Sequence, residues 1–86
     1  IDRNGGSMRI DKFLKNSRLI KRRTVAKEAC ELGRVAVNGK TVKAGFEVGL
    51  GDVIEIKFGE NLVKVEVLNV NEHVPKNQAE NMYKVI

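Results

Sequence analysis

The sequence contains few of the residues on which catalytic and disulfide-stabilised proteins depend. Its 86 residues include one cysteine, one histidine, one proline and no tryptophan. A single cysteine cannot form an internal disulfide, which favours a reducing, cytoplasmic setting. His73 has no second histidine and no cysteine beside it, so we expect neither a metal site nor a catalytic triad. We therefore expect no catalytic residues, no cofactor and no enzymatic activity.

Long apolar runs are also missing. No run approaches the roughly 20 residues that cross a membrane, so we expect no membrane partner. Hydrophobic residues make up 42% of the chain and charged residues 31%, which is typical of a globular protein rather than a disordered one. Residues 1–7 show no periodicity, and we expect them to be a disordered lead or a cloning remnant.

Positive charge is concentrated in the first half of the chain. Residues 8–45 hold eleven basic and three acidic side chains, a net charge of +8. Residues 46–86 hold four basic and seven acidic ones, a net charge of −3. The overall charge of +5 therefore hides a polarised molecule, and such asymmetry indicates that one face meets a polyanion.

Two stretches of helical spacing lie within this basic half. The first predicts a helix over residues 9–16, and the second predicts a helix over residues 22–32 that ends at Gly33, where a left-handed cap is expected. The N-terminal end of the second helix would display basic side chains beside backbone N–H groups that suit phosphate. The positions expected in the core are Ile10, Phe13, Leu14, Val25 or Ala26, Ala29 and Cys30.

After Gly33 the apolar period changes from helical spacing to alternation, which predicts strands. Asn38-Gly39 is typical of a tight hairpin, since a type I′ turn needs positive φ at both positions. Longer strands are expected over residues 53–58 and 62–70. The first of these strands carries Ile54, Ile56 and Phe58 on one face, which we expect in the core.

The tail shows helical spacing again, which predicts a short C-terminal helix docked on the core. Its core-facing positions are Ala79, Met82, Tyr83 and Ile86. Two helices followed by a small, mostly antiparallel sheet make an α+β fold.

Four short motifs occur in order between Arg9 and Phe58. They are Arg9-Ile10-Asp11-Lys12-Phe13-Leu14, then Arg23 with Ala26, then Gly33-Arg34-Val35-Ala36-Val37-Asn38-Gly39, and finally Gly51-Asp52 before Val53 and Ile54. In this order they resemble the S4 RNA-binding domain family. The resemblance implies an S4-like fold (the αL motif), with the RNA-binding domain over residues 8–70 and a C-terminal loop and docking helix over residues 71–86. Arg22 departs from the pattern, because the family usually has a serine there that could cap the second helix.

The run from Met8 to Thr24 is similar to a narrower group, the free-standing S4 proteins of bacterial ribosome-associated quality control. This group includes the RqcP type and a fifteen-kilodalton heat-shock relative, and the chain length and closing residues favour the RqcP type. The resemblance implies binding to large ribosomal subunits that still hold a nascent chain on tRNA after a stalled ribosome splits. The implied partners are large-subunit rRNA, peptidyl-tRNA and the factor RqcH, which recruits alanyl-tRNA, and the implied role is to support RqcH-dependent alanine tailing of the nascent chain. We expect a monomer off the ribosome and no DNA partner.

The candidate RNA contacts are basic residues of the two predicted helices and their flanks. Arg9 and Arg23 match basic positions of the family motif and are the first candidates. Asp11 is expected to orient one of these arginines, because phosphate would repel a carboxylate. With 5% aromatic residues, recognition of folded RNA by shape and phosphates is favoured over stacking of single-stranded bases. Supporting contacts are expected from Lys12, Arg18, Lys21, Arg22, Lys27 and Arg34.

Two other interpretations stay open. The chain could be another S4-type protein that binds rRNA or tRNA in ribosome assembly, or the targeting module of an RNA-modifying enzyme. It could also be an interaction domain whose basic face meets an acidic protein. Peptidyl-tRNA on the bound particle would discriminate against the first, and loss of RNA binding when Arg9 and Arg23 become alanine would discriminate against the second.

Overall fold

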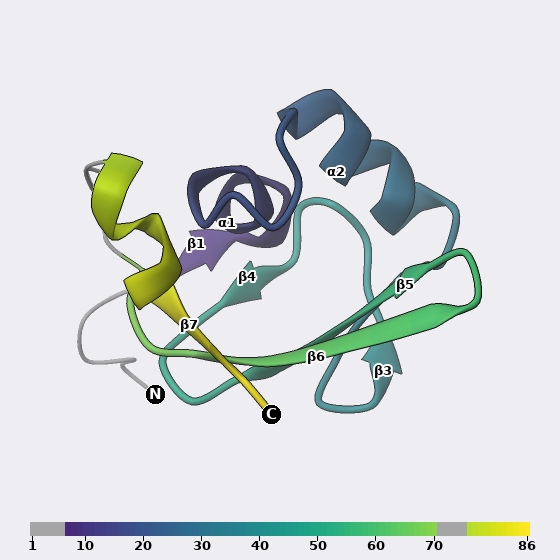
Figure 1. Ribbon diagram of the computed structural model, residues 1–86. Helices are drawn as coiled ribbons and strands as arrows, with labels where there is room; N and C mark the ends of the chain where they lie inside the picture. The colour runs from purple at the N-terminus through teal and green to yellow at the C-terminus, as the bar shows by residue number, and fades with distance from the viewer. Residues whose placement is uncertain (1–6, 71–75) are drawn as a thin grey trace.

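Two short helices cover one face of a five-stranded antiparallel sheet (Figure 1). The computed structural model describes residues 7–70 and 76–86, and His73 lies outside these ranges. The strand order is β3-β2-β5-β6-β7, while β1 pairs separately with β4. This arrangement confirms the expected α+β fold. The elements are β1 (Met8–Arg9), α1 (Ile10–Asn16), α2 (Arg23–Glu31), β2 (Val35–Val37), β3 (Lys40–Thr41), β4 (Glu47–Val48), β5 (Val53–Phe58), β6 (Asn61–Val67), the 3₁₀-helix η1 (Lys76–Met82) and β7 (Tyr83–Val85).

The core fills the space between the helices and the sheet. Each large apolar side chain that is fully removed from water there contributes about 1.5–3 kcal/mol, so the helices are held chiefly by this layer. Its central residues are Ile10, Phe13 and Leu14 of α1, Ala26 and Cys30 of α2, and Val35, Ile54, Ile56, Val65 and Val67 of the sheet.

The small residues of α2 let this helix pack closely on its neighbours. Ala26 and Cys30 are completely buried, whereas Val25 is 49% exposed, so Ala26 rather than Val25 faces the core. Gly33 has φ of +75° and follows the helix as the expected left-handed residue. Its backbone N–H donates to Cys30 O at 3.0 Å, which satisfies a carbonyl of the last turn.

The β2–β3 hairpin turns at Asn38-Gly39 as predicted. Both residues have positive φ, +51° and +86°, as a type I′ turn requires. Asn38 Nδ2 donates to Asp52 Oδ1 at 3.3 Å, and Asn38 Oδ1 accepts from the Val53 backbone N–H at 3.0 Å. Asp52 Oδ2 also accepts from the Gly49 backbone N–H at 2.9 Å. These bonds tie the hairpin to the turn between β4 and β5.

The β1–β4 pair is a feature that the sequence patterns did not reveal. Met8 lies opposite Val48, and Arg9 lies opposite Glu47. The contact continues at the next residue, where Ile10 N donates to Phe46 O at 2.7 Å. The pair therefore anchors the segment that carries Arg9 against the chain that follows the hairpin.

Two expectations about the long strands are wrong. Phe58 is 40% exposed at the turn between β5 and β6, so it lies beyond the end of the core rather than within it. β6 ends at Val67 instead of continuing to residue 70. The N–H groups of Leu68 and Asn69 donate to Met82 O at 2.8 and 3.2 Å, which turns the chain away from the ladder with β5.

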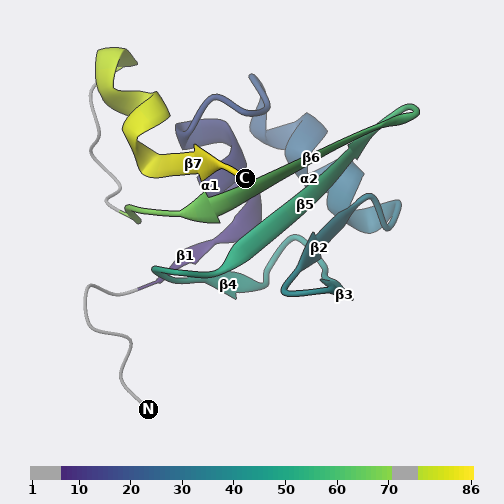
Figure 2. The same cartoon turned by 60° about the horizontal axis from the view of Figure 1, so that its bottom comes forward.

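The C-terminal segment combines a helix with a strand. In η1, Ala79 is 4% exposed and Met82 is fully buried, which confirms a short helix docked on the core. The helical interpretation of Tyr83 and Ile86 is wrong, because residues 83–85 form β7 alongside β6 (Figure 2). Ile86 N extends this pairing by donating to Lys64 O at 2.9 Å. Over so few residues, helical and alternating spacings cannot be told apart in the sequence. The pairing with β6 therefore determines that these residues form a strand.

Candidate nucleic-acid interface

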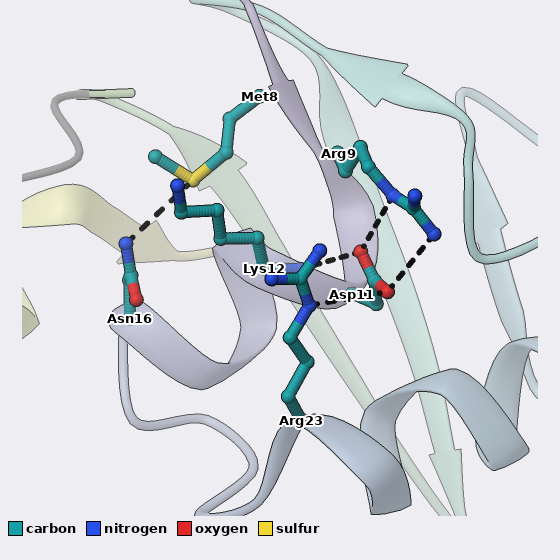
Figure 3. A network of polar contacts seen from close by, with 6 residues as sticks. All are labelled: Met8, Arg9, Asp11, Lys12, Asn16 and Arg23. Atoms are coloured by element: carbon teal, nitrogen blue, oxygen red, sulfur yellow. Dashed lines mark hydrogen bonds and ion pairs between the residues drawn. The ribbon is translucent and has the colours of Figure 1, made fainter.

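A buried carboxylate at the start of α1 organises the basic surface (Figure 3). Asp11 is 2% exposed and lies in the first turn of α1. Its Oδ1 accepts from the Lys12 backbone N–H at 2.8 Å. Arg9 donates two hydrogen bonds to the same carboxylate, from Nε to Oδ1 and from Nη2 to Oδ2, both at 3.2 Å. Arg23 Nε donates to Oδ2 at 3.4 Å. A buried charge requires such partners, because leaving it unpaired would cost several kcal/mol (about 3–5).

Asp11 brings together two arginines that are distant in sequence. Arg9 comes from β1 and Arg23 from the first residue of α2, and Figure 3 shows their guanidinium groups converging on the carboxylate. Their side chains stay 49% and 46% exposed, so both remain accessible from solvent. This confirms the prediction that Asp11 orients an arginine. We call Arg9, Asp11 and Arg23 the arginine cluster.

The start of α2 is unusually cationic for a helix N-terminus. Arg22 occupies the N-cap and makes no side-chain cap hydrogen bond, and the first turn contains no acidic residue. Cations at this end oppose the helix dipole and typically cost about 0.3–1 kcal/mol each. A bound anion would relieve this repulsion, and the exposed Lys27, one turn after Arg23, extends the same charge.

The remaining predicted contacts are arranged around this centre in different ways. Lys12 is half-buried on α1 beside the cluster, and Lys21 is exposed in the connector before α2. Arg18 has a left-handed backbone, with φ of +64°, and borders a separate hollow formed with η1 and β7. Arg34 lies beyond the C-terminal end of α2, where it lines another hollow with Lys57. The structure therefore groups Arg9, Arg23 and their neighbours, and places Arg18 and Arg34 apart from them.

Sequence reasoning missed three residues close to this surface. Lys40, Lys43 and Phe46 line one hollow beside the hairpin, and Phe46 is 40% exposed. The Asn-Gly turn marks where the hairpin tip lies. The β1–β4 pair that brings Phe46 next to Ile10 is too short to leave a periodic signal.

The described residues provide no reactive centre. Burial, followed by the negative charges of Asp11 and Glu31, raises the pKa of the Cys30 thiol to about 11. The thiol is therefore protonated at neutral pH and behaves as a small core residue. Within residues 7–70 and 76–86, no three His, Cys, Asp or Glu side chains are grouped to hold a metal ion. No helix in this part of the chain is long and apolar enough to cross a membrane.

Comparison with known proteins connects this geometry to a family. Residues 8–54 match the S4 domain. The RQC P-site tRNA stabilizing factor of Halalkalibacterium halodurans is 59% identical over 91% of this chain and 89% of that protein. The protein of the same name from Listeria monocytogenes is 52% identical over 93% of this chain and 87% of that protein. The solved structure of heat shock protein 15 from Vibrio cholerae, a trimer, has a TM-score of 0.84 with 24% identity, covering 94% of this chain and 83% of that one. This last likeness concerns the fold.

Proposed function

The chain belongs to the S4 domain family and, within it, to the RQC P-site tRNA stabilizing factors, and from this premise we propose its function. It binds tRNA in the P site of the large ribosomal subunit during ribosome-associated quality control, and it contacts the rRNA of that subunit. It is an RNA-binding factor and not an enzyme. The tRNA that it holds carries the nascent chain left after a stalled ribosome splits.

The arginine cluster is the observation that carries this proposal. A guanidinium fork matches phosphate with paired donors, and it is most effective when its orientation is fixed before binding. The buried carboxylate of Asp11 fixes two such forks while leaving each about half exposed. Arg22 and Lys27 add charge at the uncapped N-terminus of α2. Folded RNA is recognised largely through its shape and its phosphates, whereas the binding of single-stranded RNA relies on aromatic stacking platforms.

The proposed setting includes a second factor. We propose that the bound chain keeps peptidyl-tRNA in place while RqcH delivers alanyl-tRNA, so that alanine is added without a template. We further propose that it acts in the cytoplasm, on the ribosome, and that it is a monomer when free. The role beside RqcH rests on the resemblance of the sequence to the RqcP type, and the cytoplasmic setting also agrees with the single cysteine.

Sedimentation tests the function directly. The tagged chain from growing cells is separated on a sucrose gradient, and its fractions are probed for tRNA-linked nascent chains. We expect it to migrate with large subunits that carry peptidyl-tRNA. Arg9→Ala and Arg23→Ala are each expected to move into the free fractions with little change in melting temperature, because Asp11 keeps one arginine partner. Lys84→Ala removes the same charge from β7 and is the matched control.

Three outcomes would contradict the proposal in different ways. Migration with subunits that lack peptidyl-tRNA would favour a role in ribosome assembly. Retained ribosome binding by both arginine variants would move the interface away from the arginine cluster and favour a partner protein with an acidic surface. A large fall in the melting temperature of Arg23→Ala would give Arg23 a structural role in place of a binding one.

A further inference from the structure

A hollow beside the β2–β3 hairpin is lined by none of the residues of the arginine cluster. Its volume is about 700 Å³, which lies in the range of ligand pockets. None of the described residues that line it carries a carboxylate. Its lining includes Val37, Lys40, Thr41, Val42, Lys43 and Phe46.

The lining combines an apolar part with a cationic part. Val37 and Val42 are almost buried, at 3% and 8% exposure, whereas Lys40 and Lys43 are exposed. Phe46 keeps 40% of its surface in solvent, in a chain that has only three phenylalanines and one tyrosine. An accessible ring beside two ammonium groups suits a planar base flanked by phosphates. An acidic peptide would use the two lysines but would leave the ring without a planar partner.

The hollow is continuous with the segment that carries the arginine cluster. Phe46 O accepts from Ile10 N at 2.7 Å, and Ala44 O accepts from Asp11 N at 3.5 Å. Arg9 lies opposite Glu47, the residue after Phe46, in the β1–β4 pair. The loop between β3 and β4 that forms this wall connects the sheet edge to that pair (Figure 2). An RNA strand whose phosphates contact Arg9 would therefore pass beside the hollow.

We propose that the hollow holds the base of one unpaired RNA nucleotide, stacked on Phe46, with Lys40 and Lys43 contacting the adjacent phosphates. This proposal rests on the proposed RNA-binding function and refines it. Paired RNA supplies phosphates to the arginine cluster, and a bulged or looped nucleotide is selected by the hollow. The few aromatic residues provide no platform for a run of bases, but a single ring suffices for a single base.

Two RNA hairpins with the same stem test this selection. One is fully paired and the other carries a single bulged adenosine, and their affinities for the full chain are measured by fluorescence anisotropy at one salt concentration. We expect about tenfold tighter binding of the bulged hairpin, which is within the range for stacking one base on an aromatic side chain. Phe46→Ala is expected to abolish this preference without changing the affinity for the paired hairpin, and Phe46→Tyr is expected to retain it. Phe58→Ala is the matched control, because Phe58 is also 40% exposed but lies at the β5–β6 turn.

The outcomes separate this proposal from the function on which it rests. Equal affinity of the unmodified chain for both hairpins would overturn the nucleotide site, leave the RNA-binding function standing and make a peptide segment the better occupant. Equal loss of both affinities in Phe46→Ala would also overturn the site, since Phe46 would then support the whole surface. Failure of the unmodified chain to bind either hairpin would contradict RNA binding itself and, with it, this proposal.

Discussion

Asp11 and Asp52 are both buried, at 2% and 8% exposure, yet their carboxylates accept hydrogen bonds from different kinds of donor. Asp52 accepts from the Gly49 backbone N–H and from the Asn38 amide, which belong to the turns around it. Asp11 accepts from two guanidinium groups whose side chains are about half exposed. One carboxylate therefore stabilises the scaffold, and the other stabilises a charged surface.

The comparison shows how a small domain separates stability from recognition. Hydrogen bonds from backbone and amide groups can be satisfied entirely inside the fold, so the Asp52 network needs no ligand. The arginine cluster leaves two half-exposed guanidinium side chains at the surface. In the proposed function, RNA phosphates from outside the chain are their anionic partners. Substitutions in the two networks are therefore expected to differ in their effect on RNA binding: those in the arginine cluster weaken it, and those around Asp52 leave it unchanged.

The largest effect is expected when both arginines of the cluster are removed. Arg9→Ala combined with Arg23→Ala leaves the Asp11 charge buried without a cation and is expected to lower the free energy of unfolding by about 3 kcal/mol. Adding Asp11→Asn removes that charge and is expected to restore much of the stability while RNA binding stays lost. Urea denaturation and RNA binding by anisotropy measure the two quantities. A triple variant no more stable than the double variant would show that the charge of Asp11 is not what the arginines stabilise.

Asp52→Ala is also expected to lower the stability but, unlike the arginine variants, to leave RNA binding unchanged. It leaves the buried Gly49 N–H without its side-chain acceptor, which typically costs about 1–3 kcal/mol of stability. The RNA affinity of the protein that remains folded is expected to match that of the unmodified chain. Asp52→Asn, which keeps an acceptor oxygen, is the milder control. A loss of RNA affinity in these variants would indicate that the turn positions the binding surface as well as stabilising the fold.

Asp11→Asn alone distinguishes orientation from net charge. The substitution raises the formal charge of +5 by one, so attraction by charge alone would strengthen RNA binding. Because it weakens the three charge-assisted hydrogen bonds that orient the two guanidinium groups, we expect about tenfold weaker binding, on the scale of one such hydrogen bond. Anisotropy at matched ionic strength measures the change. Tighter binding would mean that the cluster acts as a sum of charges and needs no fixed geometry.

Most of the secondary structure could be predicted from local patterns in the sequence. Helical spacing located α1 and α2, and the need for positive φ located the turn at Asn38-Gly39. The β1–β4 pair was missed because two residues per strand show no period. The spacing around Tyr83 predicts a helix because short helical and extended spacings overlap, whereas its pairing with Val67 of β6 depends on the tertiary structure.

The candidate residues could be predicted from the sequence, but which of them lie together in space could not. Arg9 and Arg23 could be chosen from the motif, and Asp11 could be assigned to orient them from electrostatics. The separation of Arg18 and Arg34 from the cluster depends on the turns at either end of the helices, which residue type does not encode. The position of Phe46 beside the start of α1 likewise depends on a long-range backbone hydrogen bond with Ile10.

A smaller effect is expected from single lysines around the cluster. Lys27 is exposed one turn after Arg23, and Lys27→Gln is expected to remove one phosphate contact. The slope of log affinity against log salt should then become shallower by about 0.7–0.9, with only a few-fold loss of affinity. Lys64→Gln is the control, because Lys64 lies on β6 and pairs with Glu55 at 3.5 Å. A slope unchanged by Lys27→Gln would exclude Lys27 from the interface.

The smallest effect is a change in the titration of Cys30, which reports the charge of Asp11 without contacting RNA. The pKa of this thiol is about 11 in the folded chain against 9.0 for the ordinary thiol, because of burial and then of Asp11. Since the folded pKa is the higher one, the thiol's contribution to the free energy of unfolding is complete below pH 9.0 and is lost as pH rises through about 11.

We expect Asp11→Asn to lower the folded pKa of the Cys30 thiol while burial keeps it above 9.0, and Asp52→Asn to leave it unchanged. The ¹³Cβ signal of the single cysteine, followed against pH, measures this directly. Equal shifts in both variants would mean that Cys30 senses the general loosening of the fold, and the contrast between the two aspartates would then rest on RNA binding alone.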